Sequence, residues 1–284
     1  MKIWGVRHSL AGDMVMALPA LNYLEIKYPN SFKYWVIAKK CVQFAPIFFN
    51  HHLINQIRIT QYPERLGRED IRIAQSCDVI LDVAPQHPDG MPGTTSQSCW
   101  WNYYNIFEET FRMAGFDVEE YRKMPEELKY PKLSKWFDIE KNDTTIGIWP
   151  FTSYGLNKRS PSLKWWQELV KLLNCPIYQF GGQNDPEIVP EHNRFNNLPI
   201  FDQIKLALST RLCLNTNSGS GIILGAYGHK QVSLLTTNDA PNHTANDAAF
   251  APLNWAGNNI NIVNRESCDN ISHEEVLAAI EKLK

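Results

Sequence analysis

The fold is decided by Arg211-Leu-Cys-Leu-Asn-Thr-Asn-Ser-Gly-Ser-Gly-Ile-Ile-Leu-Gly-Ala-Tyr227. An apolar run ends in a polar, glycine-rich turn at residues 217–221, and a second apolar stretch suited to a helix begins at once. A short apolar run, Gln231–Leu235, comes next. This order predicts a buried strand, a tight turn, a helix and another strand. We therefore expect a parallel sheet in this part of the chain.

Two interpretations of the turn stay open. Gly219 and Gly221 have no side chain and Ser218 and Ser220 have small ones, so a ligand can approach the first unpaired N–H groups of the helix. These donors and the positive end of the helix dipole favour an anion such as a phosphate. Small residues are also needed for packing at any strand-to-helix turn of a doubly wound fold, so the turn alone is a weak indication of function.

Composition limits the classes of protein that this chain can represent. Its 284 residues suggest about two domains, and the 44% hydrophobic and 20% charged residues are typical of globular domains with substantial cores. The net charge of −2 gives no electrostatic footprint for nucleic acid, and no Lys/Arg run occurs. We therefore expect no nucleic-acid partner.

The cysteines and the N-terminal residues indicate a cytoplasmic protein. Six cysteines are spread along the chain without CxxC spacing, which favours reduced thiols. The first residues carry no long apolar core, and nowhere do eighteen apolar residues run together. We therefore expect neither a signal peptide nor a membrane span.

The first half opens with a strand, a loop and a helix. Lys2–Val6 has the character of a buried strand, and apolar residues at helical spacing then continue from Ala17 to Tyr28, before Pro29. Asp13 stands after the first strand, at the edge where open α/β sheets bind their ligands. It is equally suited to capping the helix, because an aspartate accepts hydrogen bonds from the first free amides.

Further strands are predicted at 34–38, 56–60 and 78–84. A loop rich in Pro, Gly, Ser and Thr then leads into an aromatic run, whose Trp100 and Tyr103 can either stack on a sugar or pack in the core. Between Arg122 and Asp143 the sequence turns polar and is interrupted by prolines, which indicates a linker.

The alternation of strands and helices then restarts. We expect strands at 145–149 and 177–180, helices at 164–173 and 203–208, and a final helix at 272–284 capped by Ser272. The pattern predicts an α/β protein with two Rossmann-like doubly wound parallel-sheet domains, 1–135 and 136–284, facing a cleft. That cleft is the natural place for a binding site.

Several motifs resemble the lipopolysaccharide heptosyltransferase family, in the same order along most of the chain. In the second half they are Ile146–Pro161 with its lysine Lys158, then Phe180-Gly181-Gly182, and then the Asn217-Ser218-Gly219 turn. In the first half, Gly12-Asp13 and Leu18-Pro19-Ala20-Leu21 are similar to the family's opening. Each motif is loose by itself, and their order and spacing make the resemblance fairly specific.

The resemblance implies a GT-B glycosyltransferase that works without a metal or cofactor and inverts the anomeric centre. Residues 1–135 would bind the acceptor, and residues 136–284 would bind a nucleotide-diphosphate sugar donor such as ADP-heptose. Asp13 would be the general base and Lys158 would hold the diphosphate. Further donors to the phosphates would be Thr152, Ser153, Ser218, Gly219 and Ser220.

The same resemblance implies an acceptor hydroxyl on a glycan or glycolipid, as in lipopolysaccharide biosynthesis, with Trp100 and Tyr103 as weaker candidates for acceptor contacts. A lipid-linked acceptor would add a weak peripheral contact with the inner face of the membrane, although no strongly basic amphipathic helix predicts one.

Departures from the family pattern fall on the donor side. Asn217 replaces an acidic residue, and Gln183 stands where an acidic residue often contacts the ribose, with Asp185 nearby. An asparagine can hydrogen-bond a sugar hydroxyl but supplies no charge. A catalytically inactive nucleotide-sugar binding protein and a nucleotide-sugar epimerase therefore remain alternatives. A nicotinamide-dependent oxidoreductase fits poorly, since the first turn lacks the G-x-G-x-x-G pattern.

Overall fold

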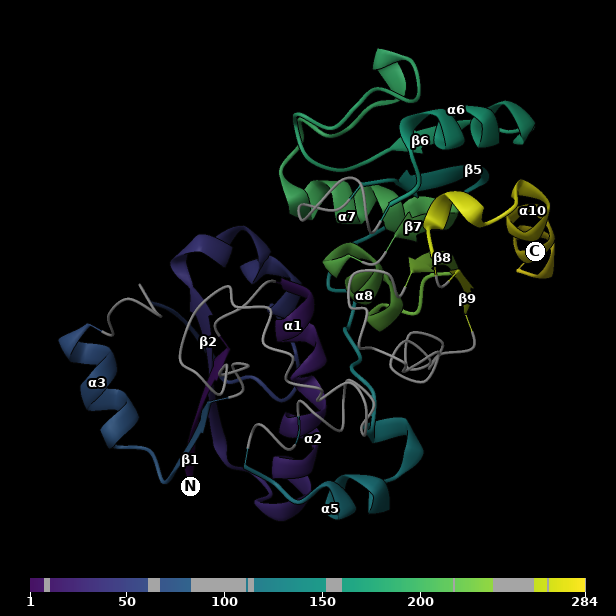
Figure 1. Cartoon of the computed structure of the whole chain (residues 1–284). Coiled ribbons are helices and arrows are strands. Elements are labelled where there is room, and N and C mark those ends of the chain that lie inside the picture. The colour runs from purple at the N-terminus through teal and green to yellow at the C-terminus, as the bar shows by residue number, and fades with distance from the viewer. Residues whose placement is uncertain are drawn as a thin grey trace. The chain divides into compact units, whose positions relative to one another are not determined.

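The structure, a computed structural model, describes residues 1–7, 11–60, 67–82, 111, 115–151, 160–216, 218–236, 258–264 and 266–283. Only the backbone is described for residues 6, 7, 11, 13, 40, 81 and 82. The chain divides into two compact units, Met1–Trp136 and Phe137–Lys284. Each unit has its own parallel sheet (Figure 1).

Unit 1 contains a four-stranded sheet in the order β3-β2-β1-β4. All of its pairings are parallel. The strand bounds are Lys2–Arg7 (β1), Phe32–Ala38 (β2), Gln56–Thr60 (β3) and Val79–Asp82 (β4). The four strands expected from the sequence are confirmed; residues 83 and 84, expected at the end of the fourth, lie outside the described residues.

Helices cover both faces of this sheet. The short α1 (Ala11–Met16) and α2 (Leu18–Lys27) lie on one face, and α3 (Arg68–Gln75) lies on the other (Figure 1). Ala74 of α3 packs with Trp4 and Val36 of the sheet. Pro19 lies in the first turn of α2, where the missing N–H needs no partner. A 3₁₀ segment, η1 (Lys39–Phe48), follows β2.

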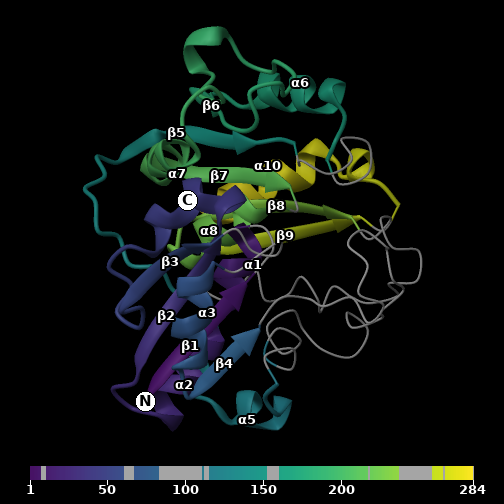
Figure 2. The same ribbon diagram turned by 90° about the vertical axis from the view of Figure 1, so that its left-hand side faces the viewer.

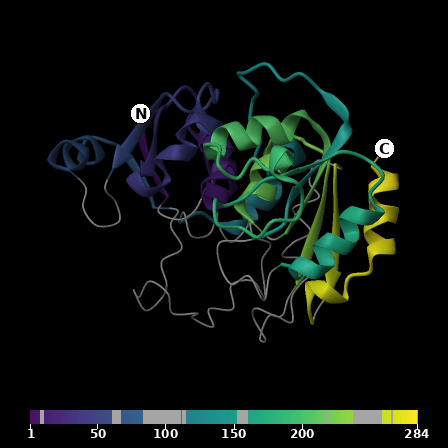
Figure 3. The same ribbon diagram turned by 90° about the horizontal axis from the view of Figure 1, so that it is seen from above.

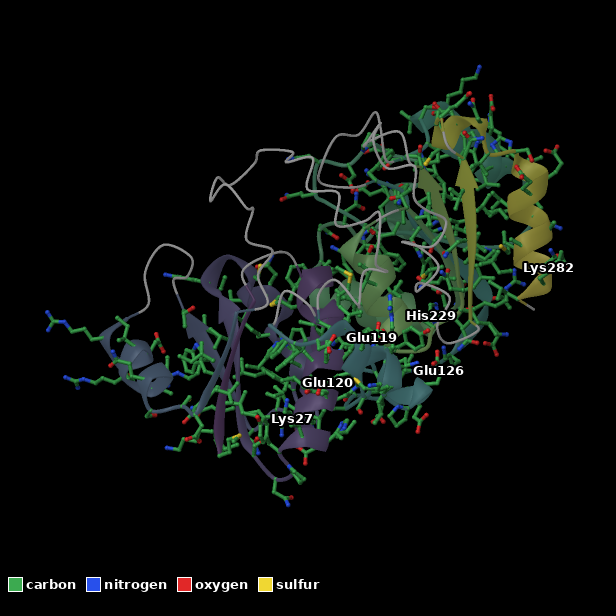
Figure 4. The ribbon with its side chains drawn as sticks, turned by 60° about the horizontal axis from the view of Figure 1, so that its bottom comes forward. Lys27, Glu119, Glu120, Glu126, His229 and Lys282 are labelled. Carbon is green, nitrogen blue, oxygen red and sulfur yellow. The ribbon has the colours of Figure 1, made fainter. Side chains whose placement is uncertain are left out.

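The last helical segments of unit 1 are α5 (Val118–Lys123) and the 3₁₀ turn η3 (Glu126–Leu128). Figure 4 shows Lys27 of α2 beside Glu120 of α5, and their charged atoms are 3.8 Å apart. Tyr23 of α2 donates its hydroxyl to the Glu120 carboxylate, so this cluster joins the two helices. No helix or strand occurs between Lys129 and Lys141.

Unit 2 contains a five-stranded parallel sheet in the order β6-β5-β7-β8-β9. Its strands point the same way, as Figure 2 shows for β5, β7, β8 and β9. Their bounds are Asn142–Trp149 (β5), Ile177–Gln179 (β6), Thr210–Thr216 (β7), Gln231–Thr236 (β8) and Asn259–Asn264 (β9). The sequence did not predict β9, whose alternating Asn and Ile residues lack a continuous apolar run.

Helices α6 (Leu163–Leu172) and α10 (His273–Lys282) cover one face of this sheet, and α7 (Ile200–Ser209) and α8 (Gly219–Ala226) cover the other (Figure 3). The core on the first face includes Trp166, Leu214 and Val276. Ser272 caps α10 in a reciprocal capping box with Glu275, as expected. Short 3₁₀ turns complete the unit at Glu191–Asn193 (η4) and Cys268–Asn270 (η6).

The described residues show neither a disulfide nor a helix suited to crossing a membrane. In the described part of the chain, the cysteines at positions 41, 77, 175, 213 and 268 form no disulfide. Within the same residues, no helix combines the length and apolar character that crossing a bilayer requires.

Gly147 marks the tightest approach inside the unit 2 sheet. A Cβ atom at this position would lie 2.6 Å from Cys213 Sγ on β7 and 3.0 Å from Phe180 Cε2. These atoms are buried and cannot move aside cheaply, because interiors are close-packed. A glycine is therefore needed for β5 and β7 to pair at this point.

We predict that Gly147→Ala lowers the free energy of unfolding by about 1–3 kcal/mol, the usual cost of overpacking a core. Chemical denaturation measures this loss. Gly5→Ala in β1 is the control, because its Cβ would meet nothing closer than Tyr34 O at 3.4 Å, an ordinary contact. Equal losses in the two variants would contradict the packing argument.

Candidate functional site

The junction of β7 and α8 forms the strand, turn and helix that the sequence predicts. Thr216 ends β7 and Gly219 begins α8, with Ser218 in the N-cap position. Serine is a favoured N-cap residue because its hydroxyl accepts from the second or third helical amide. The Ser218 side chain makes no such bond, and its Oγ lies 2.6 Å from Ser220 Oγ instead. The usual serine cap is therefore absent from the first turn of α8.

Behind this turn lies a buried polar support. Gln231 Nε2, on β8, donates to the Gly221 carbonyl at 3.0 Å, and its Oε1 accepts from Asn215 Nδ2 at 2.7 Å. A Cβ at Gly221 would lie 2.5 Å from Asn215 Oδ1, so only glycine permits α8 to come this close. The start of α8 is thereby fixed against the sheet.

A second loop leaves the same sheet after β6. Gly181 has a φ of +144°, a conformation that favours glycine. The Gly182 amide donates to Asp185 Oδ2 at 2.8 Å, and the Asp185 amide donates to the Gly182 carbonyl at 3.0 Å. This tight turn directs the Asp185 carboxylate onto the loop's own backbone and leaves the Gln183 side chain exposed.

Burial raises the pKa of the Asp185 carboxyl, and the hydrogen bond from Gly182 opposes this shift only in part. Gln203 of α7 holds the other side of the loop, with its Oε1 accepting from the Gly181 amide at 2.9 Å. The loop is therefore anchored at both of its ends, by a carboxylate and by an amide.

The sheet order brings these two loops to one edge. Strand β5 lies between β6 and β7, and all three are parallel, so their carboxyl ends share that edge. Ser218, Gly219 and Ser220 follow β7, and Gln183 follows β6. Thr152, Ser153 and Lys158, which follow β5 in the sequence, lie outside the described residues, as does Asn217.

In unit 1, Asp13 belongs to α1, which follows β1 in the interior of the sheet. It is the third residue of the helix as described, which is not an N-cap position. The structure describes its backbone but not its side chain. The two aromatic candidates for acceptor contacts, Trp100 and Tyr103, lie outside the described residues.

A metal was not expected from the sequence. Across the parts of the chain that the structure describes, no group of three or more His, Cys, Asp or Glu side chains is arranged to hold an ion. The donor atoms at the β7–α8 turn are hydroxyls and backbone amides, which suit an anion better than a cation.

Comparison with known proteins gives structural matches only. No protein-family model matches the chain, and no curated protein sequence matches it. The Escherichia coli ADP-heptose LPS heptosyltransferase II has a similar structure, with a TM-score of 0.72 at 16% identity over 100% of this chain and 98% of that one. This chain has the heptosyltransferase fold. The expected α/β architecture with two parallel sheets is therefore confirmed.

Two other solved structures are also similar to this chain. A family 9 glycosyl transferase from Veillonella parvula gives a TM-score of 0.69 at 14% identity, over 99% of this chain and 96% of that one. The iron-containing dodecameric glycosyltransferase TibC from enterotoxigenic E. coli gives 0.60 at 12% identity, over 99% and 78%. Because TibC is described as containing iron, the expected absence of a metal is not confirmed by these likenesses.

Sequence reasoning missed the buried amides that support both loops, Gln203, Asn215 and Gln231. Asn215 interrupts an apolar run, and Gln231 opens one. Polar residues are unusual in a strand that is buried on both faces, so Asn215 and Gln231 were a signal that the sequence contained. Gln203 carried no such signal, since a glutamine in a helix is ordinary.

The raised pKa of Asp185 gives a prediction about pH. The folded state keeps the carboxyl protonated to a higher pH than the unfolded chain does, so this group's contribution to stability is complete below the ordinary value of 3.8 and is lost as the pH rises through the folded-state pKa. We predict that Asp185→Asn removes this loss while its amide oxygen still accepts from Gly182. Denaturation across a pH series measures the difference.

The control is Gln183→Ala, which changes the exposed neighbour in the same turn and carries no titrating group. It should keep the pH dependence of the wild type. If Asp185→Asn and the wild type lose stability in parallel over the acid range, the interpretation of Asp185 as a partly buried, destabilised anion is wrong.

Proposed function

We propose that this chain is an inverting glycosyltransferase that moves a sugar from a nucleotide-diphosphate donor to a hydroxyl of a glycan or glycolipid. Unit 2 binds the donor, and unit 1 supplies the acceptor side. Two things support a donor of the ADP-heptose class: the resemblance of the motifs, and the fold shared with an enzyme described as acting on ADP-heptose. A fold alone does not fix an activity, so the site residues carry the argument.

The observation that carries the proposal is the missing serine cap at the N-terminus of α8. Because the Ser218 hydroxyl is turned to Ser220, it does not cap the first amides of the helix, and a ligand can take that place. The helix dipole adds a positive potential at the same point. A diphosphate satisfies both demands, and Gly219 lets it approach without a side chain in the way.

Thr216 strengthens this assignment. Its Oγ1 atom is buried at the end of β7 and has no hydrogen-bond partner among the described residues. A buried hydroxyl without a partner costs free energy, so such groups call for an explanation. A polar ligand next to the turn would supply one.

Lys158, with Thr152 and Ser153, completes the donor site in this proposal. When the bond between the anomeric carbon and the diphosphate oxygen breaks, negative charge develops on the leaving group. An ammonium group and hydroxyl donors stabilise that charge and can replace a divalent metal. These residues follow β5 in the sequence, and β5 lies between β6 and β7 in the sheet order.

Asp13 acts as the general base. A sugar hydroxyl is a poor nucleophile at neutral pH, so a carboxylate must take its proton as the oxygen attacks the anomeric carbon. The new glycosidic bond forms on the face opposite the departing diphosphate, which inverts the centre. Trp100 and Tyr103 are proposed to contact the acceptor, and a lipid-linked acceptor would bring the enzyme to the inner face of the membrane.

Gln183 and Asn217 are proposed to contact the donor's hydroxyl groups. Because the Asp185 carboxylate is engaged with the Gly182 amide, the exposed polar side chains of its turn are Gln183 and Asn184. An amide can donate to and accept from a ribose or sugar hydroxyl. The loss of an acidic residue at Asn217 is also what keeps an inactive nucleotide-sugar binding protein as the alternative.

Nucleotide binding tests the donor site. We predict that one class among ADP-, GDP-, UDP- and CMP-sugars raises the melting temperature of the wild type without magnesium, as mass action requires of a tight ligand. Lys158→Ala should abolish the shift, and calorimetry should show the lost affinity. Lys164→Ala is the control, since this lysine of α6 is exposed and its ammonium lies 3.8 Å from the Glu168 carboxylate. Absence of binding at millimolar nucleotide would contradict the donor site.

Activity tests the base. We predict that Asp13→Asn keeps donor affinity and lowers transfer by about 10²–10⁴-fold, the usual contribution of a positioned base. Product formation with a glycan acceptor measures it. Conversion of the donor without any acceptor would instead identify an epimerase. Tight donor binding with no reaction in the wild type, with any acceptor, would favour the inactive binding protein.

A further inference from the structure

Two buried glutamines hold the backbone of the loops at the carboxyl edge of the unit 2 sheet. Gln203, on α7, is 3% exposed, and Gln231, on β8, is fully buried. Both lie behind loops that the sequence and the proposed function assign to the donor. Neither side chain belongs to those loops itself.

Gln203 binds both the amide N–H and the carbonyl oxygen of Gly181. Its Oε1 accepts from the Gly181 amide at 2.9 Å, and its Nε2 lies 3.2 Å from the Gly181 carbonyl and 2.9 Å from that of Leu198. This pairing imitates a strand neighbour at a point where β6 has already ended. It fixes the glycine from which the Gly182–Asp185 turn begins.

Gln231 binds the Gly221 carbonyl in the first turn of α8. A ladder of hydrogen-bonded polar side chains across β7, β8 and β9 holds Gln231 itself. Asn215 donates to Gln231, and the Ser233 hydroxyl lies 3.1 Å from Asn215 Oδ1 and 3.0 Å from Asn259 Oδ1. Asn259 in turn donates to Asn261 at 2.6 Å. The ladder orients the Gln231 amide so that its Nε2 reaches the Gly221 carbonyl.

A purely structural role explains this arrangement poorly. Strands buried on both faces are usually filled by Val, Ile and Leu, because a buried amide must first be stripped of water. Each amide here recovers that cost by binding backbone atoms of a loop or of the first helical turn. Such networks, once satisfied, fix one geometry. What they fix in this chain is the position of two loops.

We propose that Gln203 and Gln231 are positioning residues of the donor site. They preorganise the Gly181–Asp185 turn and the first turn of α8, so that the donor meets amides already in place and no ordering cost is paid on binding. This inference rests on the proposed function, because it takes those loops as the donor site. It assigns the two glutamines no contact with the donor.

The test compares Gln203→Met and Gln231→Met with the wild type. Methionine keeps the length and the volume but removes both hydrogen-bonding atoms. We expect calorimetry to show about tenfold weaker ADP binding for each variant, equivalent to about 1.4 kcal/mol, and turnover to show a higher KM for the donor with kcat little changed. Melting temperatures are recorded for each variant.

Thr210→Val is the matched control. The Thr210 hydroxyl is fully buried and donates to the Ala207 carbonyl at 2.6 Å, at the start of β7 and away from the carboxyl edge. This variant should lose stability like the glutamine variants and keep the ADP affinity of the wild type. If Gln231→Met does not fold, Gly221→Ala replaces it, since its Cβ would push the α8 turn off Asn215.

The outcomes distinguish a failure of the proposed function from a failure of the positioning role. If the wild type binds no nucleotide, the proposed function fails. If the wild type binds ADP, and the glutamine variants bind it equally well while melting at a lower temperature, the proposed function stands and the positioning role is wrong. Weaker binding by Thr210→Val to the same degree would also overturn the positioning role, because it would tie affinity to stability in general.

Discussion

The hydrogen bond between Asn215 and Gln231 is the constraint on which the carboxyl edge of unit 2 depends. It joins two central strands through their side chains, on the face that α7 and α8 cover, and it leaves the Gln231 Nε2 free to hold Gly221. The close approach of Asn215 to Gly221 follows from it, and so does the need for glycine at that position. The α8 amides proposed to bind phosphate are placed by this pair.

The opposite face of the same sheet is stabilised differently. There the residues that alternate with Asn215 and Gln231, such as Leu214 and Val232, join Trp166 and the apolar side of α10 in a continuous core. One face therefore has a continuous apolar core, and the other also carries polar groups that specify geometry. This division lets the unit place buried amides behind a binding edge without losing its core.

Strong local signals in the sequence were sufficient for most of the fold. The apolar run before Asn217 and the glycines after it predicted β7 and α8, and Ser272 as a cap predicted the start of α10. The strand β9 escaped because its pattern alternates Asn with Ile. Those asparagines belong to the polar ladder, a tertiary feature that no local propensity encodes. Gln203 escaped for the same reason: its partner, Gly181, is 22 residues away.

The sequence predicted which loops form the candidate site but not how their side chains are oriented. Parallel strands bring residues after β6 and β7 to one edge, which sequence order and strand prediction already imply. That Asp185 turns onto the Gly182 amide while Gln183 stays exposed depends on the φ of Gly181 and on burial. The most direct test of the whole account is a crystal structure of the chain with ADP. We expect the diphosphate oxygens to accept hydrogen bonds from the Gly219 and Ser220 amides. ADP bound elsewhere, with that turn empty, would show that the β7–α8 turn is not the donor site.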